Sequence, residues 1–228
     1  MSNLPLTEKQ RAKALSTNLL INEIFLSLQG ETSSVGIPTV FIRLTGCPLR
    51  CKYCDTEYAF HEGNKLNIGE ILGKVSEYCT KHVAVTGGEP LAQKNCLPLL
   101  SQLCDEDYHV SLETSGALDV SMVDKRIVKV LDLKTPGSGE EKKNLYSNLK
   151  HLNDGDEIKF VICNRIDYEW SVQKLLAYQL AERCNVLFSP VQQQQSAAEL
   201  AEWTLEDRLP VRLHIQLHKY LWGDVAGH

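Results

Sequence analysis

The sequence predicts an α/β protein whose strands form an incomplete (partial) βα barrel of the TIM type, with six or seven mainly parallel strands. Short runs of β-branched and apolar residues alternate with longer segments of helical period, which is typical of βα units and a parallel sheet. A complete eight-stranded barrel usually needs about 250 residues. This chain has 228 residues, so we expect a barrel that stays open on one side and admits a substrate there.

Seven segments have the composition of strands, and five have the period of helices. The predicted strands are Val40–Gly46, His82–Gly88, His109–Gly116, Ile127–Lys134, Glu157–Cys163, Asn185–Pro190 and Val211–Lys219. The clearest helical segments are Ile68–Cys79, Leu97–Cys104, Lys142–Leu152, Tyr168–Arg183 and Ala197–Asp207. Residues 1–21 fit no βα unit and are predicted to form a short helical extension, while residues 22–228 form a single domain.

Composition excludes several classes of protein. The net charge of -5 gives no basic footprint for nucleic acid. No apolar run approaches the roughly 20 residues that span a bilayer, and no apolar signal stretch opens the chain. The 8 cysteines are therefore expected in a reducing compartment, and we expect a soluble cytoplasmic protein.

Three thiols, Cys47, Cys51 and Cys54, follow the first predicted strand at Cys-x3-Cys-x2-Cys spacing. Three thiolates on one short loop can hold three irons of a cubane 4Fe–4S cluster and leave the fourth iron without a protein ligand. The alternative is a structural zinc site completed by His61, but such sites usually take ligands from two separated pairs. The other cysteines fall in helix or strand patterns and are expected to be buried, so no second cluster is predicted.

Unusual residues also follow the next strands. Gly87-Gly88-Glu89-Pro90 comes after the second strand, Glu113-Thr114-Ser115-Gly116 after the third, and Leu133-Lys134-Thr135-Pro136-Gly137 after the fourth. In barrels of parallel strands the active site lies at the carboxyl ends of the strands. Each motif alone could be an ordinary turn, and Asp132 with Lys134 could be a plain ion pair. Their shared position predicts an active site at this end of the barrel.

The cysteine loop followed by the glycine motif resembles the radical S-adenosylmethionine (SAM) superfamily. The resemblance implies that SAM binds the open iron and is cleaved to a 5′-deoxyadenosyl radical, which abstracts hydrogen from a substrate. It also implies a set of SAM contacts at the strand ends. These are Tyr53, Cys54, Asp55, Gly88, Glu89, Ser115, Asp132, Leu133, Lys134, Ser189, Pro190, Val191 and Gln192.

A longer series of motifs resembles the 7-carboxy-7-deazaguanine synthase family. The series runs from SLQGE at Ser27–Glu31 through GIPTVFIRLTGC, CDT, TGGEP and ETSG to LHKYLW at Leu217–Trp222, in order over most of the chain. The resemblance implies ring contraction of 6-carboxy-5,6,7,8-tetrahydropterin to 7-carboxy-7-deazaguanine with loss of ammonia, in queuosine or related 7-deazapurine synthesis.

The same resemblance implies residues that bind the substrate and a metal ion. The pterin contacts would be Leu28, Gln29, Gly30, Glu31, Arg43, Thr86 and the terminal carboxylate of His228. Mg2+ would take Thr56 as its single protein ligand and draw its other oxygens from water and substrate. Without the family, Thr56 would be interpreted as a turn or capping residue, Arg43 as half of a salt bridge and Gln29-Gly30 as a turn.

The partners implied are the pterin, a second copy of the chain in a homodimer, and an external electron donor of flavodoxin or ferredoxin type, because no reductase domain is present. Two rival functions stay open at this point. One is a radical SAM activase that forms a glycyl radical on a partner protein, and the other is a zinc-stabilised module without chemistry.

Overall fold

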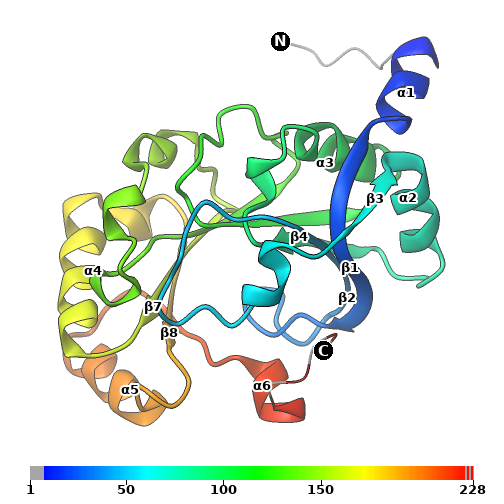
Figure 1. The fold of residues 1–228 in the computed structure, drawn as a ribbon. Helices are drawn as coiled ribbons and strands as arrows, with labels where there is room; N and C mark the ends of the chain where they lie inside the picture. The colour runs from blue at the N-terminus through cyan, green and yellow to red at the C-terminus, as the bar shows by residue number, and fades with distance from the viewer. Residues whose placement is uncertain (1–7, 224, 226, 228) are drawn as a thin grey trace.

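A single curved sheet organises the chain in the computed structural model, which describes residues 8–223, 225 and 227. The described strands follow the spatial order β3-β1-β2-β4-β5-β6-β7-β8-β9. The pairs from β2 to β9 are all parallel, whereas β1 pairs antiparallel with β2 and β3. In the described residues β3 and β9 do not pair with each other, so the barrel is open (Figure 1). The predicted incomplete barrel of mainly parallel strands is confirmed.

The strands are β1 (Asn18–Leu28), β2 (Pro38–Leu44), β3 (Asn64–Asn67), β4 (His82–Gly87), β5 (His109–Thr114), β6 (Val128–Asp132), β7 (Glu157–Ile162), β8 (Asn185–Pro190) and β9 (Arg212–Leu213). The α-helices are α1 (Glu8–Leu15), α2 (Ile68–Ser76), α3 (Cys96–Asp105), α4 (Arg165–Ala177), α5 (Ala197–Glu206) and α6 (Leu217–Trp222). Short 3-10 helices are η1 (Glu57–Phe60), η2 (Pro90–Ala92), η3 (Pro136–Ser138), η4 (Glu141–Lys143), η5 (Tyr146–His151) and η6 (Leu180–Glu182). No described helix is long and apolar enough to cross a membrane.

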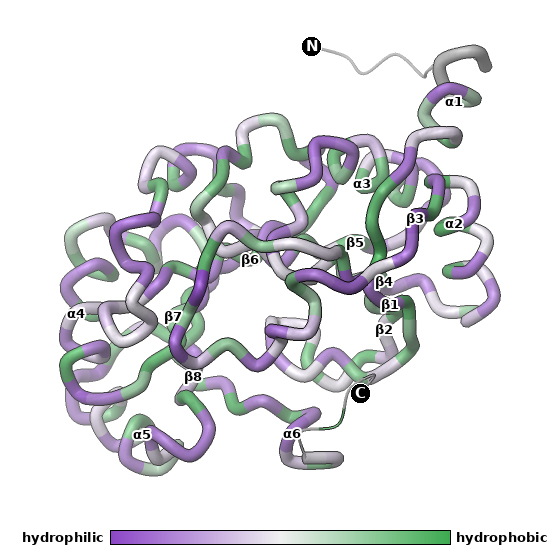
Figure 2. Tube along the Cα trace, viewed as in Figure 1, coloured by the Kyte–Doolittle hydropathy of each residue, from purple (hydrophilic) through white to green (hydrophobic). Residues whose placement is uncertain are grey.

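Helices α2, α3, α4 and α5 cover the outside of the sheet and bury one face each (Figure 1). In α2, Ile68, Ile71 and Val75 recur at helical spacing and are fully buried. Asn67 begins this helix with a capping box, since its side chain accepts from the Glu70 amide and the Glu70 carboxylate accepts from the Asn67 amide. Hydrophilic and hydrophobic residues accordingly alternate along the helices (Figure 2).

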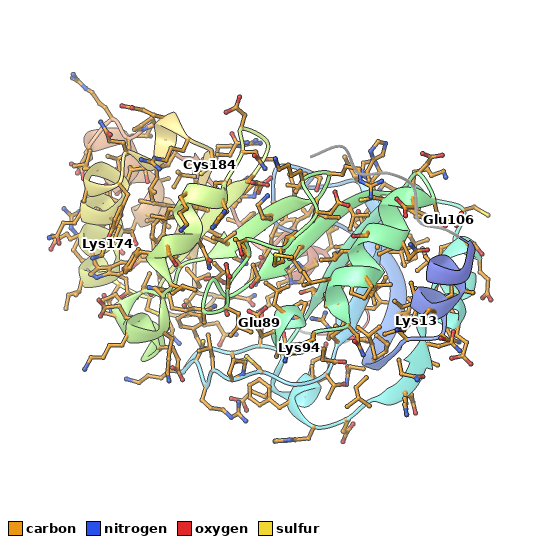
Figure 3. The ribbon with its side chains drawn as sticks, turned by 90° about the horizontal axis from the view of Figure 1, so that it is seen from above. Lys13, Glu89, Lys94, Glu106, Lys174 and Cys184 are labelled. Carbon is orange, nitrogen blue, oxygen red and sulfur yellow. The ribbon has the colours of Figure 1, made fainter. Side chains whose placement is uncertain are left out.

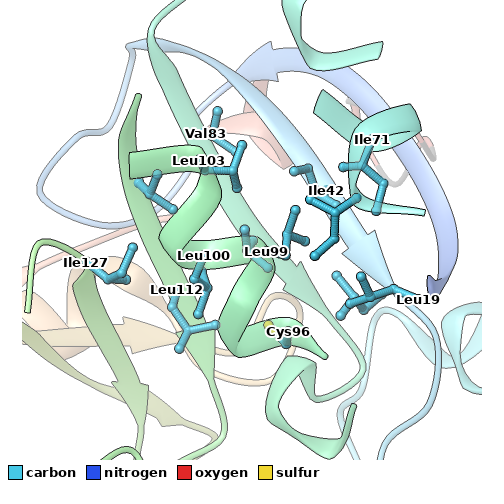
Figure 4. Close-up of a cluster of buried hydrophobic side chains, with 14 of the residues drawn as sticks. Leu19, Ile42, Ile71, Val83, Cys96, Leu99, Leu100, Leu103, Leu112 and Ile127 are labelled. Carbon is cyan, nitrogen blue, oxygen red and sulfur yellow. The ribbon is translucent and has the colours of Figure 1, made fainter. Parts of the chain in front are cut away.

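The apolar core lies between these helices and the sheet in two clusters. In the first, Leu99, Leu100 and Leu103 of α3 face Val83 and Leu112 of the neighbouring strands (Figure 4). The second cluster packs β7 and β8 against α4 and α5. This packing leaves the inner side of the sheet for polar residues.

Two predicted elements differ clearly from the structure. The predicted strand Val211–Lys219 contains only the two-residue β9, because Leu217 donates its amide to the Gly30 carbonyl at 2.9 Å and the chain turns into α6. The predicted helix Lys142–Leu152 consists of η4 and η5, separated where the Asn144 side chain bonds both backbone groups of Lys134. Strands β1 and β3 were not predicted. Of the non-cluster cysteines, Cys79 is exposed and the others are buried.

Strand β1 begins at Asn18, so the chain enters the sheet inside the predicted extension of residues 1–21. Leu19 and Ile21 are buried in the core, which is why the strand starts there. Helix α1 precedes it, as the expected helical extension requires. The division into an extension and a core domain at residue 22 stays a prediction.

Candidate active site

A cavity of about 680 Å³ opens at the carboxyl ends of the parallel strands. It is where the strand-end motifs meet, as predicted. The predicted site residues that line it are Leu28, Gln29, Gly30, Glu31, Arg43, Cys47, Cys51, Tyr53, Cys54, Asp55, Thr56, Thr86, Gly88, Ser115, Asp132, Lys134, Val191 and Gln192.

The three cluster thiols lie on the loop after β2, and each is partly buried in the cavity wall. The Leu49 amide donates to the Cys47 sulfur at 3.4 Å, a contact that would stabilise the thiolate when iron is bound. Burial raises the pKa of all three thiols and brings that of Cys51 to about 11. The metal-free thiols are therefore neutral, and binding of iron to them would release protons.

Gly88 makes room for this loop. A Cβ on residue 88 would lie 2.3 Å from the Gly46 carbonyl oxygen and 2.8 Å from the Cys47 Cβ. The backbone after β4 thus passes directly beside the cysteine loop, and only glycine permits this approach. The Gly87-Gly88 pair is therefore more than an ordinary turn.

The donor set fits an iron–sulfur cluster better than a single ion. Within the described part of the chain, no three His, Cys, Asp or Glu side chains converge closely enough to hold one metal ion. A cubane bonds each thiolate to a different iron and so does not require such convergence. His61, the proposed fourth zinc ligand, is exposed and does not line the cavity.

Glu89 is buried beneath the cavity rim and organises it. Its carboxylate accepts hydrogen bonds from the Thr114 hydroxyl at 2.9 Å, the Ser115 amide at 2.7 Å and hydroxyl, and the Leu91 amide at 3.0 Å. Figure 3 labels Glu89 in the central part of the molecule, whereas Lys174 and Glu106 lie at the periphery. The carboxylate joins the ends of β4 and β5, and direct contact with SAM stays a prediction.

Asp132 and Lys134 form the ion pair that was the alternative interpretation of these residues, with Lys134 Nζ 3.0 Å from Asp132 Oδ2. The other oxygen, Oδ1, is buried and has no hydrogen-bond partner in the described residues. An acceptor in this state suits a bound ligand that brings its own donor. Nearby, burial raises the pKa of the Tyr53 hydroxyl, so Tyr53 stays neutral beside the cysteine loop.

The loop after β1 enters the cavity from the open side of the barrel. Gln29 donates its amide to Glu113 Oε1 at 3.1 Å and accepts from the Glu31 backbone amide at 3.2 Å. Burial raises the pKa of Glu113, whereas Lys159 holds the pKa of Glu31 below its usual value despite burial. The cavity therefore holds an ionised carboxylate, that of Glu31, and a second carboxylate, that of Glu113, which takes up a proton more readily.

Arg43 projects from β2 into the cavity between two aromatic rings. Its Nε donates to Glu23 Oε1 at 2.7 Å, and its guanidinium carbon lies 5.7 Å from the ring centroids of Phe25 and Tyr58. The salt bridge weighed from the sequence is thus present. Only Nε takes part in it, which leaves the terminal amines for a ligand carboxylate.

The C-terminal segment closes one side of the cavity over the cysteine loop. Gln216 donates to Glu31 Oε1 at 2.7 Å and to Asp55 Oδ2 at 3.2 Å, and Lys219 Nζ lies 3.0 Å from Asp55 Oδ2. The Thr56 hydroxyl donates to Asp55 Oδ1 at 2.8 Å and makes no capping bond at η1. Thr56 nevertheless lines the cavity, where a hydroxyl oxygen can serve a hard cation.

Some predicted residues lie elsewhere, and some lining residues were not predicted. Glu89, Leu133, Ser189 and Pro190 are buried next to the cavity without lining it. His228 lies outside the described residues. Several charged or polar side chains line the cavity although they were not predicted as ligand contacts: Lys52, Tyr58, Glu113, Thr114, Lys159, Gln193, Gln194, Gln216, His218 and Lys219. Glu113 belongs to a strand-end motif but was not predicted as a contact, and Lys159 sits inside a strand pattern, where alternation with apolar neighbours was its only signal.

Comparisons with known proteins agree with this geometry. The family model of the Radical SAM superfamily matches residues 41–182, which is more than half of the chain. A 7-carboxy-7-deazaguanine synthase from Chlorobaculum tepidum is 44% identical over 91% of this chain and 96% of its own length. Another from Koribacter versatilis is 41% identical over 89% and 96%. The crystal structure of QueE from Escherichia coli matches with a TM-score of 0.78 and 25% identity, covering 93% of this chain and 100% of that one.

An open barrel with three thiols and a glycine turn at its rim, together with the superfamily match, defines a radical SAM protein. The identities over nearly complete lengths are more specific. The chain belongs to the 7-carboxy-7-deazaguanine synthase family.

Proposed function

We propose that the protein converts 6-carboxy-5,6,7,8-tetrahydropterin to 7-carboxy-7-deazaguanine with release of ammonia, as a carbon–nitrogen lyase of 7-deazapurine biosynthesis. The observation that carries the proposal is one cavity lined by the cysteine loop, the rim at Ser115 and Asp132, and the loop at Gln29–Glu31. A bound cluster and SAM supply the one-electron chemistry that starts the rearrangement.

The chain's own residues would bind and orient the pterin. Arg43 offers a guanidinium fork for the substrate carboxylate, because its terminal amines are not used by Glu23. Gln29 and Glu31 present an amide and a carboxylate that can pair with the pterin edge. Thr56 would hold Mg2+ next to the substrate carboxylate, and the loop and C-terminal segment would exclude water.

An external electron donor of flavodoxin or ferredoxin type would reduce the cluster, and we place its docking surface on the cysteine loop. Arg50 and Lys52 are exposed there, and Lys142 and Lys143 are exposed on the adjoining η4. The neighbouring carboxylates are engaged internally: Glu140 accepts from the Arg50 amide at 2.7 Å and Glu141 from the Trp170 indole at 3.1 Å. These lysines make no ion pair with the described residues, so the surface suits an acidic partner.

A homodimer and a cytoplasmic location complete the proposal. The dimer rests on the family resemblance, and sedimentation velocity tests it. The location rests on the cluster thiols, which are free cysteines and must stay reduced to bind iron.

An anaerobic assay tests the function. Iron-reconstituted protein is incubated with SAM, Mg2+, a reductant and the tetrahydropterin, and mass spectrometry detects 7-carboxy-7-deazaguanine. Cleavage of SAM without this product would favour the activase alternative. Intact SAM in protein with a verified cluster would overturn the radical SAM function.

A further inference from the structure

Lys159 occupies the middle of the cavity between two carboxylates that belong to different parts of the proposed site. Its Nζ donates to Glu31 Oε2 and lies 3.6 Å from Asp132 Oδ2. Glu31 is on the loop that would bind the pterin, and Asp132 is on the rim that would bind SAM. In the described residues, no other ion pair joins these two regions.

The sequence of β7 explains how a lysine reaches this place. Ile158, Phe160 and Ile162 are fully buried in the core, so the intervening Lys159 and Val161 point into the cavity. Only 12% of the Lys159 side chain is exposed. Burial disfavours its charge, but the carboxylates of Glu31, Asp132 and Glu113 raise its pKa well above the usual value, so the ammonium persists.

Both carboxylates that pair with Lys159, those of Asp132 and Glu31, have a second partner. Asp132 Oδ2 also lies 3.0 Å from Lys134 Nζ, and Glu31 Oε1 accepts from Gln216 at 2.7 Å. Gln216 in turn bonds Asp55 on the cysteine loop. A continuous series of ion pairs and hydrogen bonds therefore connects the proposed SAM rim, through Lys159, to the pterin loop and the C-terminal segment.

Removing the ammonium would leave Glu31, Asp132 and Glu113 facing one another in a buried cavity, where like charges repel strongly. The loop and the rim would then no longer be held in one relative position. Conversely, a ligand that fixes Asp132 also fixes Lys159 and, through it, Glu31.

We propose that Lys159 is a positioning residue that couples the SAM site to the pterin site, so that binding of either molecule strengthens binding of the other. This inference rests on the proposed function. Because binding linkage is reciprocal, the same factor applies in both directions.

Equilibrium binding tests the coupling without turnover. Anaerobic protein with an oxidised cluster and no reductant is titrated with SAM by calorimetry, with and without saturating 6-carboxy-5,6,7,8-tetrahydropterin. We expect the pterin to lower the dissociation constant of SAM roughly fivefold or more in the natural protein. The coupling ratio is the dissociation constant of SAM without pterin divided by that with pterin. In Lys159→Gln and Lys159→Met this ratio should fall to about one. Lys159→Arg should retain part of the coupling because the charge remains.

Lys129→Gln is the matched control. Lys129 forms a buried ion pair with Asp156 at 2.8 Å, and neither residue lines the cavity. The Lys129→Gln substitution should lower the unfolding temperature but leave the coupling ratio unchanged. A lysine with only a structural role at position 159 would behave in the same way, which makes the coupling ratio decisive.

The outcomes separate the two proposals. If natural protein forms product but SAM binding is independent of pterin, or if both neutral variants keep the natural ratio, the coupling is overturned and the function stands. If natural protein binds SAM but neither binds nor converts the pterin, the proposed function fails. Should the Gln and Met variants not fold, an unchanged ratio in Asp132→Asn, which removes the other half of the bridge, would also overturn the coupling.

Discussion

Gly30 packs against the imidazole of His218, so closely that a Cβ on residue 30 would overlap His218 Nδ1. The Gly30 carbonyl also accepts the Leu217 amide at 2.9 Å. The two residues come from opposite ends of the chain, and the contact seats α6 on the loop after β1. The motifs SLQGE and LHKYLW therefore form one structural unit at the cavity, which explains why they occur together.

Replacing Gly30 with alanine should displace the C-terminal segment from the cavity. The added methyl cannot fit beside His218, so Gln216 and Lys219 should lose their positions over Glu31 and Asp55. We expect the KM for the pterin to rise about tenfold, which corresponds to about 1.4 kcal/mol. Steady-state kinetics under anaerobic conditions measure the change.

Gly73→Ala is the control for this substitution. Gly73 lies within α2, and an added Cβ meets no atom within 4 Å. It should stabilise the helix by about 0.5–1 kcal/mol and leave kinetics unchanged. Equal pterin KM values for Gly30→Ala and the natural protein would show that the contact with His218 does not shape the site.

Gly88→Ala should prevent cluster assembly. Its Cβ would collide with the Gly46 carbonyl and the Cys47 Cβ, so either β4 or the cysteine loop must move. We expect the iron content after reconstitution to fall well below that of the natural protein, as measured by iron and sulfide analysis. Gly155→Ala, where a Cβ meets nothing, should reconstitute normally. Full iron content in Gly88→Ala would contradict this account of the turn.

Lys52→Glu should slow reduction by a protein donor and not by a chemical one. The substitution reverses a charge at the exposed edge of the cysteine loop, and association between charged partners depends on such complementarity. Turnover supported by flavodoxin should decrease, and the loss should diminish at high salt. Turnover with dithionite, which needs no docking, reports whether the site itself is intact.

Lys125→Glu makes the same charge change before β6, at the opposite end of the sheet from the cavity. It should leave flavodoxin-supported turnover unchanged. An equal decrease in both variants would indicate that net charge matters and that this surface does not.

The sequence predicted the parts of the fold that repeat. Most of the parallel strands are short β-branched runs followed by a helix or a 3-10 helix, although β5 leads into β6 without one. The predicted start of β4, β5, β7 and β8 coincides with the observed one. Strand β1 was not predicted because it is antiparallel and no helix follows it, so it does not belong to a βα repeat. The end of β9 was predicted too late in the chain because the turn into α6 depends on Gly30, which lies more than 180 residues earlier.

Lining residues that belong to a recognisable motif could be predicted from the sequence, whereas isolated lining residues could not. The three cysteines and Gly88 carry spacing and backbone signals that are visible in one chain. Lys159 carries only the alternation of its strand, and a charged residue in a strand usually faces water. The curvature of the open barrel places it inside the cavity, beside Glu31 and Asp132.

Glu89→Gln should destabilise the protein and loosen the rim. The carboxylate accepts four groups from Leu91, Thr114 and Ser115, and an amide would turn one acceptor oxygen into a donor that faces other donors. We expect a loss of about 1–3 kcal/mol in the free energy of unfolding, measured by urea denaturation. Glu70→Gln, at the exposed capping box of α2, should cost less. Equal losses would show that the buried network adds no extra stability.

Acidification should release the C-terminal segment. Burial lowers the pKa of both His214 and His218 below the ordinary 6.5, so both imidazoles are neutral in the docked segment. In the undocked segment they protonate as the pH falls through 6.5, and the docked state resists this until a lower pH. Docking is therefore at full strength above 6.5 and weakens below it.

Hydrogen exchange, corrected for the intrinsic rate at each pH, measures this release. Protection of residues 214–222 should fall between about pH 7.5 and about pH 5.5, whereas α3, which contains no histidine, should not change in parallel. His218→Gln should retain more protection at the lower pH, because the amide does not titrate. Undiminished protection in the natural protein would mean that the docked segment tolerates the imidazolium, and that the carboxylates of Glu31 and Asp55, which favour the protonated form of His218, outweigh burial.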